Sequence, residues 1–164
     1  MGKQNIEDFY YNAAEILSLL YAMFPVRSIL MVEDISGPIK WDNTGLPDRR
    51  SQACFESMVW LSDHGLLEFR SIEDRNIGIE GAVLTQKAFV LLTSPIIWEG
   101  NEPESRIDAL MAARQELAYA NMNTLIADLL RANCFWVSPA SPPELRKHET
   151  LNVLDDGEGF DDGQ

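Results

Sequence analysis

Apolar residues recur at every third or fourth position at the start of the chain. The series is Ile6, Phe9, Ala13, Ile16, Leu17, Leu20 and Phe24. This spacing places them on one side of a helix, so the pattern predicts an amphipathic helix over residues 5–24. Pro25 follows directly and ends or redirects that helix, because proline cannot continue the backbone hydrogen bonding.

The next apolar stretch, residues 26–35, is too short for its pattern to distinguish helix from strand. It contains Ile29, Leu30 and Val32 before the break at Ser36-Gly37-Pro38. We interpret it as a second helix, with a buried strand as the alternative. Residues 37–47 are rich in glycine, proline, aspartate and asparagine, which predicts a long loop.

A second amphipathic helix is predicted over residues 48–64. Asp48 can accept backbone N–H groups as its N-cap, and Phe55, Met58 and Val59 belong to its apolar face. Gly65 can adopt the left-handed conformation that ends a helix.

A β-hairpin and a short helix are predicted to follow. Leu66 and Leu67 indicate a strand, residues 73–76 form a polar tip, and residues 77–84 form the returning strand. Thr85 then caps a short helix that carries apolar residues, namely Ala88, Phe89, Leu91 and Leu92.

Two segments of this region resemble the second half of a winged-helix domain. They are Trp60-Leu61-x-x-x-Gly65-Leu66 before the hairpin and Leu84-Thr85-x-Lys87-Ala88-Phe89 after it, with Ala88 where that pattern often has glycine. The resemblance covers residues 5–94 and implies a mainly α fold with a small β-hairpin, in a winged-helix domain over residues 5–98. Winged helices serve in DNA binding, protein bridging and dimerisation, so the resemblance alone does not select a function.

The pattern beyond this domain predicts one long helix over residues 101–132, with Asn101 and Glu104 as a capping box. At about 1.5 Å per residue it would span roughly 45 Å, more than a small domain can cover. Its stripe therefore predicts either packing across its own domain or a homodimer, and the polar Arg114 and Asn121 could set the register of such an interface. The stripe includes Ile107, Leu110, Met111, Leu117, Met122, Leu125 and Leu129.

Residues 138–164 begin with a proline-rich linker and then carry many acids. This composition is typical of a flexible tail. The alternative is a segment that docks on a partner through a few apolar anchors, namely Leu151, Val153, Leu154 and Phe160.

The net charge of −13 puts the chain at a disadvantage in binding nucleic acid, because such binding depends on neutralising phosphates with Lys and Arg. No run of about 20 apolar residues predicts a membrane span, and the N-terminus lacks a signal-peptide pattern. We expect a cytoplasmic protein.

No catalytic or metal-binding motif is evident. Cys54 and His64 are ten residues apart on one predicted helix, about 15 Å of rise, which is too far for a hydrogen bond. The cysteines and histidines have no ligand spacing, and no glycine-rich phosphate loop follows a strand. We therefore expect a non-enzymatic protein without metal or cofactor.

Two functions remain. The first is protein–protein contact, as an adaptor or inhibitor that docks on a basic, nucleic-acid-handling partner. Small acidic proteins of phage and mobile elements sometimes act in this way. The alternative is a dimeric DNA-binding transcriptional regulator that reads DNA with helix 48–64. Its candidate contacts are Arg49, Arg50, Gln52, Ser57 and Arg75. Glu56 on the same helix and the acids of the hairpin tip oppose that alternative.

Overall fold

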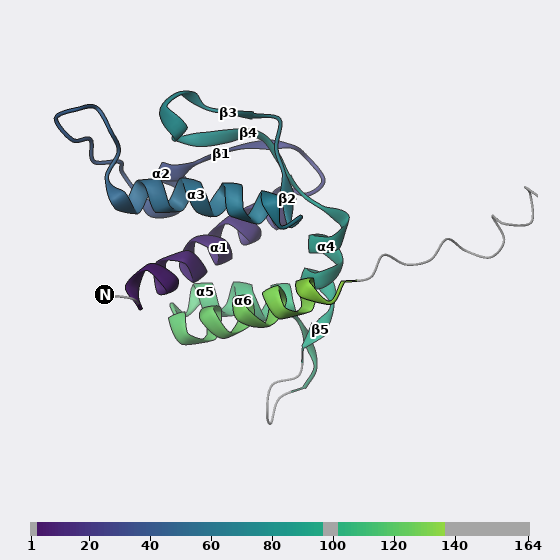
Figure 1. Ribbon diagram of the computed structural model, residues 1–164. Helices are drawn as coiled ribbons and strands as arrows, with labels where there is room; N and C mark the ends of the chain where they lie inside the picture. The colour runs from purple at the N-terminus through teal and green to yellow at the C-terminus, as the bar shows by residue number, and fades with distance from the viewer. Residues whose placement is uncertain (1–2, 97–101, 137–164) are drawn as a thin grey trace, which may run out of the picture.

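The first helix, α1 (Gln4–Met23), is the centre of the structure, a computed structural model that describes residues 3–96 and 102–136. Figure 1 shows α1 between two layers, with the sheet and α3 on one side and α5 and α6 on the other. Residues on several sides of α1, including Ala13, Ile16 and Leu17, are fully buried. The helix predicted over residues 5–24 is confirmed.

The sheet is small and antiparallel. Its strands are β1 (Ser28–Met31), β2 (Leu67–Glu68), β3 (Ser71–Ile72) and β4 (Gly78–Leu84). Strand β4 pairs with all three of the others. A short 3₁₀ turn, η1 (Asp74–Asn76), forms the tip of the β3–β4 hairpin. The predicted hairpin is confirmed, and the molecule is mainly helical with a small antiparallel sheet.

Residues 26–35 correct one prediction. The predicted helix is wrong for the first part of this stretch, where β1 forms, and the short helix α2 (Val32–Ser36) follows it. Leu30 faces the core and lies opposite Ile79, whereas Ile29 is 58% exposed. Burial therefore alternates as in a strand, and the hydrogen-bond partner is β4, about fifty residues further along the chain.

Two helices follow their local signals. Helix α3 (Arg49–Asp63) begins where Asp48 accepts the backbone N–H of Ser51 at 2.8 Å, and Gly65 after its end has φ +71°. Helix α4 (Gln86–Thr93) begins where the Thr85 hydroxyl accepts the N–H of Ala88 at 3.1 Å. Both caps were predicted from the sequence and both are confirmed.

The long helix predicted over 101–132 is wrong, because the chain folds back on itself. A short β5–β6 ladder (Pro95–Ile96 with Glu104–Ser105) precedes α5 (Arg106–Gln115) and α6 (Tyr119–Cys134). Leu117 turns the chain between them with φ +53°. Ser105 caps α5 by accepting the N–H of Asp108, so the helix does not begin at the predicted capping box, and Asn101 lies outside the described residues.

Folding back lets α5 and α6 bury their stripe against each other and against α1. Ile107, Leu110, Met122, Leu125 and Leu129 are buried in the same core as α1 and α3, and Met111 is partly buried. Leu117, at the turn, is 65% exposed. Most of the predicted stripe therefore packs within the chain, and homodimerisation stays a prediction.

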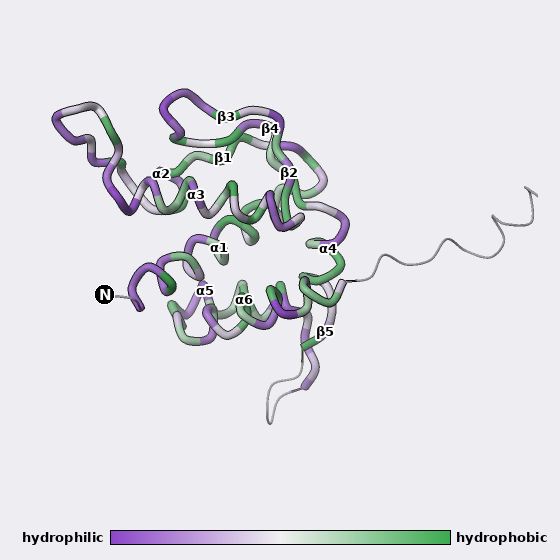
Figure 2. The backbone as a smooth tube through the Cα atoms, viewed as in Figure 1, coloured by the Kyte–Doolittle hydropathy of each residue, from purple (hydrophilic) through white to green (hydrophobic). Residues whose placement is uncertain are grey.

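Polar residues concentrate at the edges of this core. Figure 2 shows hydrophilic residues gathered along the loop before α3 and at the turn between β3 and β4. The predicted tail anchors Leu151, Val153, Leu154 and Phe160 lie outside the described residues. In the part of the chain that the structure describes, no helix combines the length and apolar character that a membrane span needs.

Candidate interaction surface

The loop 37–47 and the tip of the β3–β4 hairpin both project near the first half of α3, on the same side of that helix (Figure 1). The loop is held by Asp42, whose carboxylate accepts the Thr44 hydroxyl at 2.6 Å and the Leu46 N–H at 2.9 Å. These hydrogen bonds lower the pKa of Asp42, and the bond from the Thr44 hydroxyl has the largest effect. We call the side of α3 together with the loop and the hairpin tip the α3 surface.

Arg49 and Arg50 are exposed at the first turn of α3, as the DNA-binding alternative requires. Neither forms an ion pair within the described ranges. The preceding cap is negative, because the N–H of Ser51 stabilises the ionised carboxylate of Asp48 and lowers its pKa. The positive charge at this end of the helix is therefore accompanied by a carboxylate.

The side chains of two other predicted DNA contacts form hydrogen bonds within the protein. Ser57 is buried and donates its hydroxyl to the carbonyl of Ala53 at 2.8 Å. Gln52 is exposed, but its amide nitrogen donates to the carbonyl of Pro47 at 2.6 Å. The prediction that Ser57 faces a ligand is wrong, because the helix turns that position into the protein.

Arg75 joins the hairpin tip to the loop. Its guanidinium carbon lies 5.6 Å from the centre of the Trp41 ring, within range of a cation–π contact. A cavity of about 180 Å³ lies beside this contact, and its walls include Leu46, Phe55 and Asn76. Arg75, a predicted DNA contact, therefore also links the hairpin tip to the loop 37–47.

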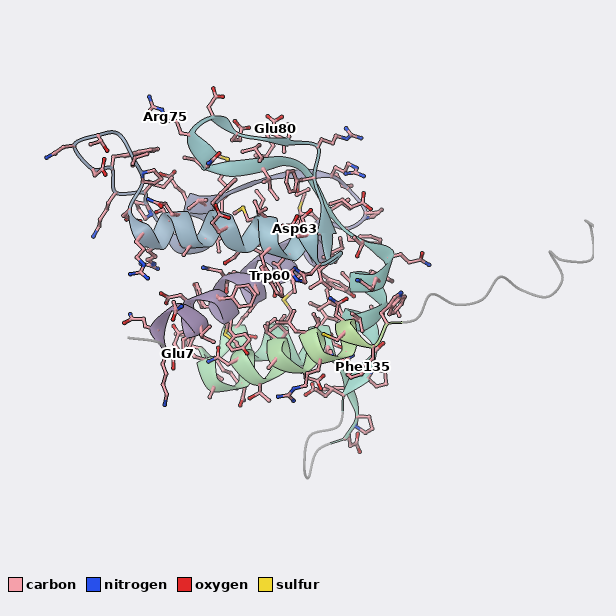
Figure 3. The ribbon with its side chains drawn as sticks, in the orientation of Figure 1. Glu7, Trp60, Asp63, Arg75, Glu80 and Phe135 are labelled. Atoms are coloured by element: carbon pink, nitrogen blue, oxygen red, sulfur yellow. The ribbon has the colours of Figure 1, made fainter. Side chains whose placement is uncertain are left out.

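Acids are prominent on the α3 surface. Glu56 and Asp63 are exposed on α3, and Asp74 is exposed at the hairpin tip. Glu80 is exposed on β4 beside the core-facing Ile79, so it lies on the sheet face away from α3 (Figure 3). Glu80 accepts the Ser71 hydroxyl at 2.8 Å, which lowers the pKa of Glu80. A side-chain hydrogen bond to Glu80 raises the pKa of Glu73, followed by smaller effects of burial and nearby negative charge. The α3 surface therefore carries exposed carboxylates as well as exposed arginines.

Trp60 is a contact candidate that the sequence analysis did not single out. It is 38% exposed, stacks on the His64 ring at 3.7 Å between ring centres, and meets the edge of Phe9 at 5.1 Å. The carbonyl of His64 accepts hydrogen bonds from Lys87 and Asn133. The partly exposed indole was recognisable from its position away from the apolar face of the helix.

A separate groove of about 730 Å³ lies where the first turns of α1, α3 and α6 meet. The rings of Tyr11 and Tyr119 lie 6.1 Å apart in its wall, and Arg50 reaches it from α3. Burial, then Glu15 and Tyr119, raise the pKa of Tyr11, while Arg50 and Arg114 oppose the shift. The groove is formed by α1, α3 and α6, which are far apart in the sequence, so no local motif predicts it.

The described residues do not bring together side chains that could hold a metal ion. Within residues 3–96 and 102–136, no three His, Cys, Asp or Glu side chains are placed to hold a metal ion. Cys54 is buried, and burial raises the pKa of its thiol to about 11, which keeps it protonated near neutral pH. The His64 Nδ1 lies 2.8 Å from the Trp60 carbonyl, at the other end of α3 from Asp48.

Comparison of the chain with protein-family models, with curated proteins and with solved structures returns no match.

Proposed function

We propose that this chain is a winged-helix protein that acts by protein–protein contact, docking its α3 surface on a basic, nucleic-acid-handling partner. The observation that carries the proposal is the set of carboxylates on the exposed side of α3 and at the hairpin tip, namely Glu56, Asp63 and Asp74. The succession of α3, a small hairpin and a capped helix α4 supports the resemblance in fold.

Electrostatics and shape both favour a basic protein over DNA. Complementary charge steers encounter and fixes orientation, whereas carboxylates beside a phosphate backbone repel it. Trp60 supplies a large, partly exposed aromatic surface of the kind that anchors interfaces. Its stacking on His64 holds the indole in one orientation before a partner arrives, which lowers the entropic cost of binding.

One observation favours the alternative, a dimeric transcriptional regulator. Arg49 and Arg50 are exposed at the first turn of α3, the end of a recognition helix that reads base edges. Burial of Ser57 and the bond from Gln52 to Pro47 reduce the set of side chains available for readout. The two arginines are therefore the decisive residues for this alternative.

The test combines site-specific cross-linking with a charge-matched control. A photo-reactive amino acid replaces Ala53 on the exposed side of α3, and the cross-linked partner is identified and purified. Its affinity is then measured for the wild type, for Glu56→Lys with Asp63→Lys, and for Glu102→Lys with Glu116→Lys, which changes the same charge elsewhere. We expect the α3 variant to weaken binding by about tenfold or more, and the control to change it little.

A duplex titration addresses the alternative. Fluorescence anisotropy with a mixed-sequence duplex at low salt should show no saturable binding. Saturable binding that disappears in the Arg49→Ala, Arg50→Ala variant, together with partner binding that ignores the α3 charge reversal, would replace the docking proposal with DNA recognition.

A further inference from the structure

We propose that residues 151–162 of this chain dock on an apolar patch formed by the end of α1, the residues that follow it, and α4. We call this the α1–α4 patch. Its members are Met23, Phe24, Val26, Phe89 and Val90. Figure 1 shows α4 at one end of the molecule and the loop 37–47 at the other. The α1–α4 patch is therefore a different site from the α3 surface, and this proposal does not rest on the proposed function.

The α1–α4 patch exposes apolar side chains that the core does not cover. The exposed fractions are 61% for Val26, 48% for Met23 and 37% for Val90. The rings of Phe24 and Phe89 stack at 4.7 Å between their centres, which joins the end of α1 to α4. A group of exposed apolar residues held together in this way marks a site of interaction.

The charge near the α1–α4 patch differs in sign from that of the whole chain. The net charge of the chain is −13, yet residues 16–32 and 81–98 contain no Asp or Glu and contribute Arg27 and Lys87. Arg27 pairs with Glu68 at 3.2 Å, and Lys87 donates to the neutral carbonyl of His64 at 3.1 Å. The two cations and Glu68 together carry a positive charge, which favours an acidic partner.

Residues 151–162 have the composition that this patch requires. They contain no Lys or Arg, and they lie outside the described residues. Their apolar members are Leu151, Val153, Leu154 and Phe160, and their acids are Asp155, Asp156, Glu158, Asp161 and Asp162. Apolar anchors interleaved with carboxylates complement an apolar surface flanked by cations.

The chain also leaves the described structure close to the patch. Helices α4 and α6 pack together, and Figure 1 shows the end of α6 beside α4. The connecting residues 137–150 span up to about 46 Å when extended, whereas α1 is about 30 Å long. A tether of this length gives the docking segment an effective concentration in the millimolar range, so weak contacts are enough to hold it.

A spin label on the full chain tests the proposal by NMR. Gly157→Cys carries the nitroxide, and Cys134→Ser removes the exposed native thiol, while Cys54 is buried. We expect the label to broaden the amide signals of Val26 and Val90 about fivefold or more above those of Leu46, an exposed apolar residue on the loop 37–47. High salt should reduce the broadening, because it screens the attraction between the acids and the cations.

Two pairs of variants separate docking from the mere nearness of a tethered segment. Leu154→Ser with Phe160→Ser should reduce the broadening about fivefold or more, whereas Leu145→Ser, outside the docking segment, should leave it unchanged. Val26→Asp with Val90→Asp should have the same effect as the first variant, and Leu46→Asp with Leu117→Asp should have none. All four of these positions are exposed, so the Tm should change little, and the serine variants leave the described residues unaltered.

A mixed sample determines whether the docking segment belongs to the same chain. The spin label is placed on one copy and the isotope label on another, and we expect no broadening at Val26 or Val90. Three results would overturn the proposal: no broadening in the singly prepared chain, broadening that the serine pair leaves unchanged, or equal broadening in the mixed sample, which would assign the contact to a second copy.

Discussion

The ion pair between Glu15 and Arg114 joins the two layers of the fold and offers a quantitative test. Arg114 Nε and an Nη bind the two carboxylate oxygens at 2.9 and 2.7 Å, so the pair is bidentate. The side chains are only 16% and 25% exposed, for Glu15 and Arg114 respectively. The hydrogen bond that Arg114 donates to Glu15 is also the main reason that the pKa of Arg114 is raised. Helix α1 thereby holds α5 in place across 99 positions of sequence.

The magnitude follows from burial and geometry. Two unit charges about 4 Å apart interact by about 4 kcal/mol at an effective dielectric constant of about 20, and the lost hydration of both groups offsets part of that. We expect a coupling free energy of about 2 kcal/mol. For a chain of this length, losing that amount lowers the Tm by roughly 4–8 °C.

A double-mutant cycle measures the coupling directly. Urea unfolding free energies are compared for Glu15→Gln, Arg114→Met and the double variant. The pair Arg27–Glu68 is the control within the same chain, because its side chains are 35% and 59% exposed and its contact is 3.2 Å. Exposed pairs contribute about 0.2–1 kcal/mol. A coupling for Glu15–Arg114 no larger than that of Arg27–Glu68 would refute the reasoning from burial and bidentate geometry.

Three further predictions concern single positions. The raised pKa of buried Cys54, about 11 against the ordinary 9.0, means that its contribution to stability is complete below pH 9 and is lost as the pH rises through 11. The difference in unfolding free energy between wild type and Cys54→Ala should therefore shrink by roughly 2–3 kcal/mol over that window, and a constant difference would contradict this. Asp48→Ala should lower the free energy of unfolding in urea by about 1 kcal/mol at neutral pH, and Asp48→Asn should lower it less. Hydrogen bonding lowers the pKa of Asp48, so the stability that its carboxylate contributes is present above the ordinary pKa and is lost as the pH falls through the lowered pKa. Equal costs for the two substitutions would argue against capping. Leu117→Gly should be neutral or stabilising by up to about 1 kcal/mol because φ is +53° and the side chain is exposed, whereas Leu117→Val should destabilise; the Tm values of the two variants check this, and a lower Tm for glycine than for valine would count against it.

The parts of the fold that sequence analysis predicted are those whose signals are local. Helix α3 has its cap at Asp48 and its end signal at Gly65, with the apolar spacing between them. The polar residues 73–76 marked the hairpin tip, between the apolar Leu66 and Leu67 and the returning strand β4. Each of these signals acts within a few residues. The chain therefore carries this information before it folds.

Other features depended on contacts between distant segments. Strand β1 needs β4 as its hydrogen-bond partner, and a short apolar run does not reveal that partner. The break at Leu117 occurs without glycine or proline, because folding back buries Met122, Leu125 and Leu129 against α1 and α5. Hydrophobic burial there outweighs the modest cost of a left-handed leucine.

The candidate sites divide along the same line. Exposure of Arg49 and Arg50 followed from their place at the start of α3, but the burial of Ser57 depended on how the helix packs. The groove between α1, α3 and α6 could not be predicted, since these helices come together only when the core forms. The sequence by itself determined α1, α3 and α4, the caps at Asp48 and Thr85, and the charge of this protein. The tertiary structure decided which faces those elements hide and which cavity they enclose, because burial is a property of neighbours that are far apart in the chain.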